Sequence, residues 1–268
     1  MDVNGVELCV ETFGDPGDPA VLLIHGACAS MLWWQTELCA ALAARGRFVI
    51  RYDNRDTGLS VSYPPGRPGY ALSDMVLDAV GILDALGVER AHVVGRSMSG
   101  GIALALGVEH ADRVASLTFL ATTTGDPGLP PMTEAFLEAS GQQSSSSDVE
   151  NIVSVLRAYA GPSPHFDEDA VRLLAVEDVA RTVNLQSAMT NHFCIEYDAP
   201  RSGGFGDIVA PTLVVHGALD PVFPLAHGEA LRDAVPGASL LVLDSVGHDL
   251  PRVVWPLFVD ALVAHTSA

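Results

Sequence analysis

A serine stands where an apolar strand pattern passes directly into a helical pattern. Residues 93–101 read V-V-G-R-S-M-S-G-G, with Ser97 at their centre. Gly95 and Ser99 flank it by two positions on either side, and only small residues there avoid collision in a tight strand-to-helix turn. Such a turn raises the hydroxyl above the sheet edge and aims the first amides of the helix at a bound group. This pattern predicts that Ser97 is a catalytic nucleophile.

Two later loops contain the acid and the base that a serine nucleophile needs. The hydroxyl is a weak nucleophile until a histidine accepts its proton, and that histidine must be oriented by a carboxylate. Asp220 follows the strand pattern of Thr212–His216, and His248 follows that of Leu240–Asp244. Ligands of open α/β sheets bind beside the carboxyl ends of the strands, so both loops are expected on the same face as Ser97. These three residues form the predicted catalytic triad.

Other residues of suitable type are weaker candidates for these roles. Asp249 adjoins His248 and cannot readily reach the far nitrogen of its neighbour's ring, while Asp244 lies nearer the strand. His216 lies inside a strand pattern, where a histidine is more often a hydrogen-bonded core residue. Cys28 lacks the sharp turn that would expose a thiol nucleophile. None of these displaces the predicted triad.

The order serine, aspartate, histidine along the chain resembles that of the α/β-hydrolase family. Residues 95–99 resemble its nucleophile elbow, G-x-S-x-G, with Ser99 in place of the last glycine. The resemblance covers nearly the whole chain, weakens between residues 125 and 206, and is closest to the aclacinomycin methylesterase type of actinobacterial serine esterases. Three stretches carry it: residues 51–58 (R-Y-D-N-R-D-T-G), residues 90–95 (R-A-H-V-V-G), and residues 211–214 (P-T-L-V) together with G-H at 247–248.

The oxyanion of a tetrahedral intermediate needs two preorganised N–H donors. The amide of Met98, directly after the nucleophile, is the first expected donor. The second is expected from residues 25–28 (H-G-A-C), and the family resemblance places it on Ala27. Gly26 allows the backbone to turn in closely there. Met98 and Ala27 therefore form the predicted oxyanion hole.

Three further residues are predicted to contact the substrate, and three charged residues near the motifs need an interpretation. Trp33, just past the oxyanion loop, and His192 and Phe193, at the end of a helical region, are the predicted substrate contacts. Arg96 meets either a substrate carboxylate or, as the favoured interpretation, one of the acidic side chains in a salt bridge. Residues 53–60 resemble a family loop, D-x-R-x-x-G-x-S, whose aspartate and arginine are expected to pin neighbouring loops through charge-assisted hydrogen bonds.

The predicted activity is hydrolysis of carboxylic esters of small to medium, mostly apolar substrates, including methyl and other small esters of secondary metabolites. Hydrolysis of a carbon–carbon bond and perhydrolysis are alternatives, because members of the family perform both with the same triad. A third hypothesis is a non-catalytic receptor for a small apolar ligand. It predicts a defective triad, and the intact Ser97, Asp220 and His248 argue against it. Dehalogenases and epoxide hydrolases of this fold carry an aspartate at the elbow, so Ser97 disfavours both.

Composition excludes several classes of protein. The 268 residues include 14 basic and 33 acidic side chains, for a formal charge of −19. So acidic a chain repels phosphate, which excludes a nucleic-acid binder and favours neutral over anionic substrates. All 14 basic residues are arginine, which excludes lysine Schiff-base and P-loop chemistry. No apolar stretch reaches the roughly 20 residues of a membrane span, and there is no signal-peptide pattern. Four scattered cysteines predict a cytoplasmic protein without disulfides, metal or cofactor.

The elements that must position these residues read as an α/β fold, with a mostly parallel central sheet flanked by helices. The predicted core comprises residues 1–124 and 207–268. Strand patterns disappear in residues 125–206, which are predicted to form a helical cap, or lid, inserted after the sixth strand as the resemblance implies. The predicted strands are Val6–Phe13, Val21–His25, Phe48–Asp53, His92–Gly95, Ser116–Ala121, Thr212–His216 and Leu240–Asp244. The predicted lid helices are Val149–Tyr159, Glu168–Ala175 and Val179–Thr190.

Overall fold

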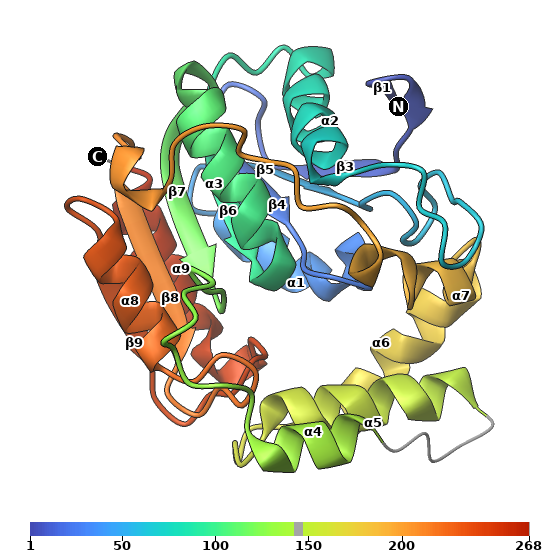
Figure 1. Ribbon diagram of the computed structural model, residues 1–268. Coiled ribbons are helices and arrows are strands. Elements are labelled where there is room, and N and C mark those ends of the chain that lie inside the picture. The colour runs from blue at the N-terminus through green and yellow to red at the C-terminus, as the bar shows by residue number, and fades with distance from the viewer. Residues whose placement is uncertain (142–146, 268) are drawn as a thin grey trace.

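A seven-stranded sheet forms the centre of the computed structural model, which describes residues 1–141 and 147–267 (Figure 1). The strand order is β3-β5-β4-β6-β7-β8-β9; the edge strand β3 runs antiparallel to β5, and the other neighbouring pairs are parallel. These strands are β3 (Val10–Phe13), β4 (Ala20–Ile24), β5 (Phe48–Tyr52), β6 (Ala91–Arg96), β7 (Val114–Leu120), β8 (Thr212–Gly217) and β9 (Ser239–Leu243). At the start of the chain, β1 (Asp2–Val3) and β2 (Val6–Glu7) pair antiparallel as a separate sheet. The mostly parallel sheet confirms the predicted fold class.

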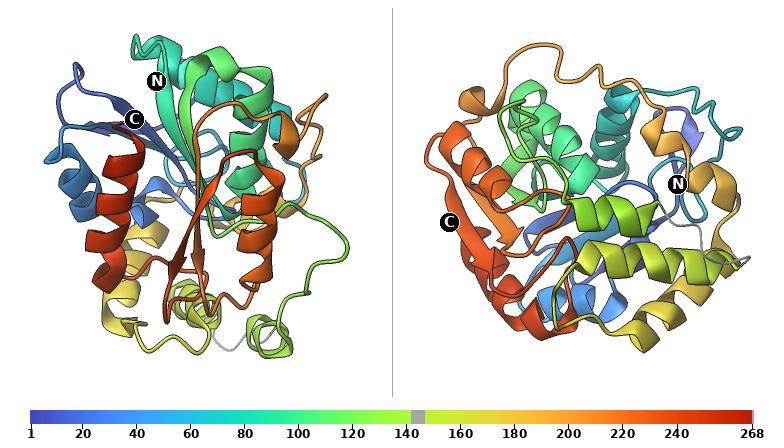
Figure 2. Two further views of the ribbon diagram at one scale, coloured as in Figure 1. Left: turned by 90° about the vertical axis from the view of Figure 1, so that its left-hand side faces the viewer. Right: turned by 60° about the horizontal axis from the view of Figure 1, so that its bottom comes forward.

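Helices cover both faces of the sheet (Figure 2). One face carries α1 (Thr36–Ala43) and α9 (Trp255–His265), and the other carries α2 (Leu72–Ala85), α3 (Gly100–Glu109) and α8 (Ala226–Ala234). All five residues of β4 are buried, with Val21 and Leu23 in the first of these apolar layers and Leu22 and Ile24 in the second. Because both faces are buried, the central strands read as continuous apolar runs rather than as alternating ones.

A helical stretch of chain connects β7 to β8 and lies beyond the carboxyl ends of the parallel strands (Figure 1). We call residues 121–211, which make this connection, the insertion. Its helices are α4 (Glu134–Ser140), α5 (Asp148–Ala160), α6 (Glu168–Arg181) and α7 (Leu185–Ala188), followed by the 3₁₀ helix Asn191–Phe193. Open α/β sheets bind their ligands at the carboxyl ends of the strands, so the insertion faces the edge where a site is expected.

The structure differs from the sequence prediction in the order and bounds of some elements. The lid is expected after a sixth strand, whereas the insertion follows β7, the fifth strand of the large sheet along the chain. The strand expected over Val6–Phe13 is divided between two sheets, because β2 pairs with β1 and β3 pairs with β5. The helix expected over Val179–Thr190 is also divided, because Thr182 leaves the helical conformation and the Asn184 side chain caps α7. α4 has no counterpart in the prediction.

The loop after β5 pins its neighbours as the sequence predicts. Arg55 forms a two-pronged salt bridge with the buried Asp78, with nitrogen–oxygen distances of 2.6 and 2.7 Å. Asp53 is fully buried and accepts the amide of Met31 at 2.7 Å. Its other oxygen lies 2.8 Å from Nη2 of Arg181 on α6. Asp53 therefore connects the loop after β5 both to the segment after β4 and to the insertion.

The structure also bears on membrane spans, metal ligands and cysteines within the residues that it describes. No helix within 1–141 and 147–267 is long and apolar enough to cross a membrane. The same residues hold no group of three or more His, Cys, Asp or Glu side chains placed to bind a metal ion. All four cysteines are free thiols.

Candidate active site

The sharp turn predicted around Ser97 lies between β6 and α3. Ser97 takes a left-handed conformation with a φ of 49°, and a single 3₁₀ turn over Ser97–Ser99 leads into α3. Position 95 requires glycine, because a Cβ there would lie 2.4 Å from the carbonyl oxygen of Ser99. Thr122, just after β7, donates its hydroxyl to the Ser97 carbonyl at 2.7 Å. Close packing and this hydrogen bond hold the strained serine in place.

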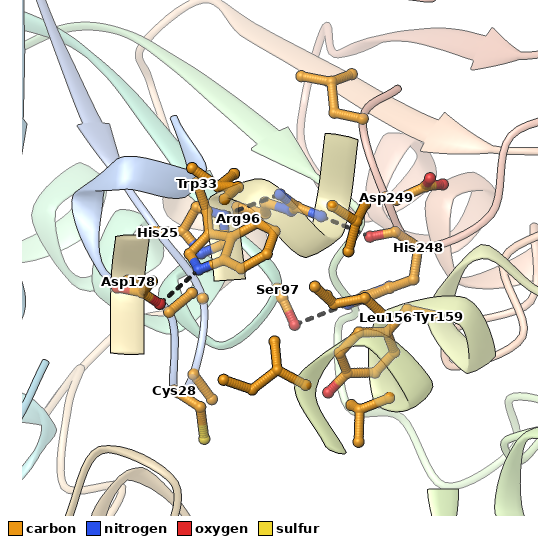
Figure 3. A pocket seen from close by; sticks show the side chains of 18 of the residues that line it. His25, Cys28, Trp33, Arg96, Ser97, Leu156, Tyr159, Asp178, His248 and Asp249 are labelled. Carbon is orange, nitrogen blue, oxygen red and sulfur yellow. Dashed lines mark hydrogen bonds between the residues drawn. The ribbon is translucent and has the colours of Figure 1, made fainter. Parts of the chain in front are cut away.

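Ser97, His248 and Asp220 form a continuous hydrogen-bonded chain, part of which is visible in Figure 3. Oγ of Ser97 lies 3.0 Å from Nε2 of His248, although the two residues are 151 positions apart. Nδ1 of His248 lies 2.7 Å from Oδ2 of Asp220. Because an ionised carboxylate only accepts hydrogen bonds, Nδ1 carries the hydrogen, which leaves Nε2 free to accept a proton from Ser97. The structure thus brings the three predicted residues together in the required order.

The carboxylate of Asp220 is buried and held by several donors. Its Oδ1 accepts the amides of Val222 at 2.9 Å and of Phe223 at 2.8 Å. The ring of His216 lies 3.6 Å from Oδ2 and hydrogen-bonds the Phe223 carbonyl at 2.7 Å. Burial raises the pKa of Asp220, but His248, His216 and the Phe223 amide together bring it below its ordinary value. Asp220 therefore stays ionised and can orient His248.

The surroundings of the rival residues Asp249, Asp244 and Cys28 do not suit them to the roles of acid or nucleophile. Within the described part of the chain, no hydrogen bond joins Asp249 to the ring of His248, and Asp244 is exposed. Cys28 lines the cavity described below, but burial raises its pKa to about 12, so it remains a protonated thiol. None of Asp249, Asp244 and Cys28 therefore replaces a member of the predicted triad.

The loop after β4 approaches Ser97 from the side opposite His248 (Figure 3). A Cβ at Gly26 would lie 2.9 Å from the Cβ of Ser97, so only glycine permits this approach. The amide of Ala27 has no hydrogen-bond acceptor among the residues that the structure describes. The Met98 amide stands at the start of a helical turn, where intrahelical acceptors are missing. Two unused amides beside the serine match the donors that an oxyanion hole requires.

Arg96 does not form the salt bridge favoured for it from the sequence with any carboxylate that the structure describes. Its guanidinium hydrogen-bonds Nε2 of His25 at 2.9 Å and the carbonyl of His248 at 2.8 Å. In residues 1–141 and 147–267 no carboxylate lies within salt-bridge distance of it. Burial and then the charge of Arg96 hold the pKa of His25 well below its ordinary value, so the neutral ring accepts from Arg96. Arg96 thereby joins the start of the oxyanion loop to the backbone of His248.

A cavity of about 790 Å³ opens in front of Ser97, between the carboxyl edge of the sheet and the insertion. Its walls are mainly apolar and rich in aromatic rings, among them Trp33, Phe136, Tyr159, Phe166 and Phe223. The rings of Tyr159 and Phe223 lie 5.2 and 5.5 Å from the imidazole of His248, measured between ring centres. Such walls suit an apolar molecule and exclude water from the imidazole.

The three predicted substrate contacts have different surroundings. Trp33 lines the cavity, and its indole Nε1 donates to Asp178 at 2.8 Å (Figure 3). Phe193 also lines it, with 69% of its surface exposed. His192 is a correction to the prediction, because its ring is fully buried outside the lining and both ring nitrogens are hydrogen-bonded to backbone groups. The ring predicted to face a substrate instead hydrogen-bonds the Cys28 amide and the Arg55 carbonyl.

Sequence reasoning missed Tyr159, Phe223 and Asp178. The carbonyl of Tyr159, at the end of α5, accepts the amide of His248 at 2.8 Å. Phe223 follows the triad aspartate by three positions, so its place in the same loop was a usable signal. Asp178 is buried on a helix whose other acidic side chains are mostly exposed, and no local pattern distinguishes it from them.

The chain resembles known hydrolases in sequence and in fold. A sequence profile described as "alpha/beta hydrolase fold" matches residues 19–251. A rhodomycin D methylesterase of Streptomyces sp. (strain C5) is 32% identical, over 98% of this chain and 96% of the relative. A 2-hydroxymuconate semialdehyde hydrolase of Pseudomonas putida is 28% identical, over 87% of this chain and 81% of the relative. The crystal structure of an enol-lactonase from Burkholderia xenovorans has the same fold, with a TM-score of 0.78, 24% identity and coverage of 99% of this chain and 98% of that one.

Proposed function

This chain belongs to the alpha/beta hydrolase fold family, and we propose that within it the protein is a serine esterase that cleaves carboxylic esters through an acyl-enzyme intermediate. The proposal rests on one observation above all. The hydrogen-bonded chain Asp220–His248–Ser97 faces a mainly apolar cavity on the side where the Ala27 and Met98 amides are unused. Nucleophile, base, orienting acid and oxyanion donors are then all supplied by this chain.

Acylation starts with proton transfer from Ser97 to His248. Nε2 of His248 accepts the hydroxyl proton as Oγ attacks the ester carbonyl, and Asp220 stabilises the imidazolium that forms. The amides of Ala27 and Met98 donate to the oxygen that becomes negative, and each such donor contributes about 3 kcal/mol to transition-state stabilisation. His248 then gives its proton to the leaving alkoxide, which departs as an alcohol.

Deacylation repeats these steps with water as the nucleophile. A water molecule takes the place of the alcohol, His248 accepts its proton, and the hydroxide attacks the acyl carbon. The tetrahedral intermediate collapses with release of the acid, and Ser97 regains the proton from His248. No residue beyond the five named is needed for either half-reaction.

The cavity and the relatives support a mostly apolar ester with a small alcohol group. A volume of about 790 Å³ with aromatic walls accommodates an acid of several fused or linked rings. The relatives named as rhodomycin D methylesterases span 98% of this chain. The insertion, proposed here as the lid of the predicted core, supplies much of that wall, so it is expected to select the substrate.

Carbon–carbon bond hydrolysis is the second candidate, because 2-hydroxymuconate semialdehyde hydrolases also match most of this chain. Both reactions use a serine, a histidine and an oxyanion hole, so the triad does not separate them. Product analysis does. An ester yields an acid and an alcohol, whereas a vinylogous 1,5-diketone yields an acid and a dienol.

The test of the proposal is labelling with a fluorophosphonate followed by peptide mapping, together with turnover of an ester panel. Wild-type protein is expected to carry the label on Ser97 and to hydrolyse p-nitrophenyl and methyl esters. Ser97→Ala is expected to lose both the label and about 10⁶-fold in kcat. A wild-type protein that is not labelled on Ser97, or a Ser97→Ala variant that keeps turnover, would falsify the proposal.

A further inference from the structure

The oxyanion loop is held from two different parts of the molecule. Its start is held by the core, where the His25 carbonyl accepts the Ser99 hydroxyl at 2.6 Å and the Asn54 amide at 3.1 Å. Its end is held by the insertion, where the Cys28 amide donates to Nδ1 of His192 at 3.0 Å. Ala27, the proposed oxyanion donor, lies between these two attachment points.

The ring of His192 is fixed in one orientation and one tautomer. Its Nε2 lies 2.9 Å from the carbonyl of Arg55, which can only accept, so Nε2 carries the hydrogen. Nδ1 is therefore unprotonated and accepts from Cys28, as the geometry requires. The side chain is fully buried. No part of the imidazole remains free for a substrate, and its polar atoms contact only the two loops that flank the site.

The hydrogen bond to Cys28 acts on a strained peptide. Cys28 has a φ of 65°, a left-handed conformation that side chains other than glycine rarely adopt. The Ala27–Cys28 peptide is planar, so an anchored Cys28 amide also sets the direction of the Ala27 carbonyl and the ψ angle of Ala27. Without an acceptor on the insertion, this peptide is free to relax by rotation, which would turn Ala27 relative to Ser97.

A second attachment holds the same loop a few residues further along the chain. Its acceptor is Asp178 on α6. Asp178 accepts the hydroxyl of Ser30 through one oxygen and the indole Nε1 of Trp33 through the other, the latter at 2.8 Å (Figure 3). Asp178 and Ser30 are 148 positions apart in sequence. The insertion therefore holds the segment after Ala27 at two places that are independent of each other.

From this geometry we infer that His192 is a positioning residue of the oxyanion hole, and that Asp178 supports the same loop. The inference rests on the proposed function, because it assigns the hole to the Ala27 and Met98 amides. Its consequence is that the insertion does more than enclose the substrate. One of the two oxyanion donors stays in its working position only while the insertion holds the loop.

A matched pair of variants separates positioning from bulk structure. Asn places its Oδ1 near the position of Nδ1 in His, whereas Leu has the shape of Asn without the acceptor. His192→Leu is expected to lower kcat, and the rate of Ser97 labelling by a fluorophosphonate, by about 10- to 100-fold, with KM within about threefold of wild type. His192→Asn is expected to stay within about fivefold of wild type in both rates.

The labelling rate makes the outcome independent of the substrate. If wild type itself is not labelled on Ser97, the proposed function fails. If wild type is labelled and the Leu and Asn variants differ by less than about twofold, the positioning role is overturned while the function stands. A loss confined to KM, or to the unfolding temperature with an unchanged labelling rate, overturns it as well.

Asp178→Asn carries the same test should His192→Leu fail to fold. Its single side-chain oxygen accepts from only one of Ser30 and Trp33, so kcat and the labelling rate are expected to fall by about 10-fold. Unchanged rates in Asp178→Asn would overturn the part of the inference that assigns support of the loop to Asp178 on α6.

Discussion

The two halves of the proposed oxyanion hole are built in different ways. Met98 follows the nucleophile directly, on a turn fixed by Gly95, by the hydrogen bond from Thr122 and by the start of α3. Ala27 lies on a loop whose far side is held by His192 and Asp178, which are 164 and 148 positions from their partners. One donor is thus a product of local chain geometry. The other depends on contacts between the core and the insertion.

This difference predicts how variants of the two halves should differ in their effects. A strand-to-helix turn is closed by steric contacts between near neighbours, and it forms whenever β6 and α3 pack on the sheet. A long-range attachment costs chain entropy and exists only after both parts have folded. We therefore expect variants of the core half to act on chemistry alone, and variants of the insertion half to act on chemistry and on stability together.

The largest expected effect comes from the triad, which lies wholly in the core. Asp220→Asn leaves the shape of the site intact but destroys the tautomer control of His248, so kcat should fall by about 10⁴-fold. Asp244→Asn is the matched control, because Asp244 is exposed and is expected to retain kcat within about twofold. Steady-state kinetics on a p-nitrophenyl ester measures both. Equal losses in the two variants would contradict the assignment of the acid.

A second variant weakens the attachment of the insertion to the core and leaves the residues with the Ala27 and Met98 amides unchanged. Arg181→Met leaves the fully buried Asp53 without its cation, so the free energy of unfolding should fall by about 3 kcal/mol. Arg157→Met removes a salt bridge with Glu168 at the surface and should cost less than about 1 kcal/mol. Urea denaturation followed by circular dichroism compares them. Equal losses in the two variants would contradict the role of the Arg181–Asp53 pair in attaching the insertion to the core.

A third variant probes the attachment of the Ala27 loop to the core, at the position where this chain departs from the family motif. Ser99→Ala removes one of two donors to the His25 carbonyl, and because Asn54 remains, kcat should fall by only about 3- to 10-fold. Ser116→Ala serves as control, since it removes a buried hydroxyl from β7 that bonds His92. That control should change stability and leave kcat unaltered. A kcat loss in Ser99→Ala larger than that of His192→Leu would show that the core, and not the insertion, provides the more important attachment of the Ala27 loop.

The smallest expected effect is a pH dependence of stability that belongs to the insertion half. Burial lowers the pKa of His192 and outweighs the Arg55 carbonyl and the Asp56 carboxylate, which both raise it. The folded ring therefore stays neutral, whereas the unfolded one titrates at about 6.5. The unfolded state then binds the extra proton, and the folded state loses stability as pH falls below about 6.5.

The variant His192→Asn isolates this contribution. Between about pH 6.5 and the lowered pKa of His192, wild type should lose up to about 1.4 kcal/mol per pH unit more than the variant, as measured by urea midpoints at several pH values. At neutral pH and above, the two curves should run parallel. Parallel curves at acid pH as well would show that His192 titrates normally in the folded state.

Much of the core could be predicted because its residues act through local patterns. The apolar runs of β4, β6 and β8 are buried on both faces, and each ends next to a residue of the candidate site. Ser97 directly follows β6, and Asp220 lies three residues after β8; His248 lies five residues after the less buried edge strand β9. The bounds of the lid helices were harder to predict, because the side-chain cap of Asn184 and the extended Thr182 divide what the apolar spacing presents as one helix.

The sequence by itself determined the chemistry that is available: a serine on a sharp turn, a histidine and an aspartate after two strands, and glycines where backbones must meet. It could do so because steric limits on a turn, and the shared edge of parallel strands, follow from residue types and their order. Only the tertiary structure decided what His192 does, since a histidine near the end of a helical region fits a substrate contact and a backbone support equally well. Its complete burial and its two hydrogen-bond partners more than a hundred positions away, Cys28 and Arg55, support the second of these interpretations.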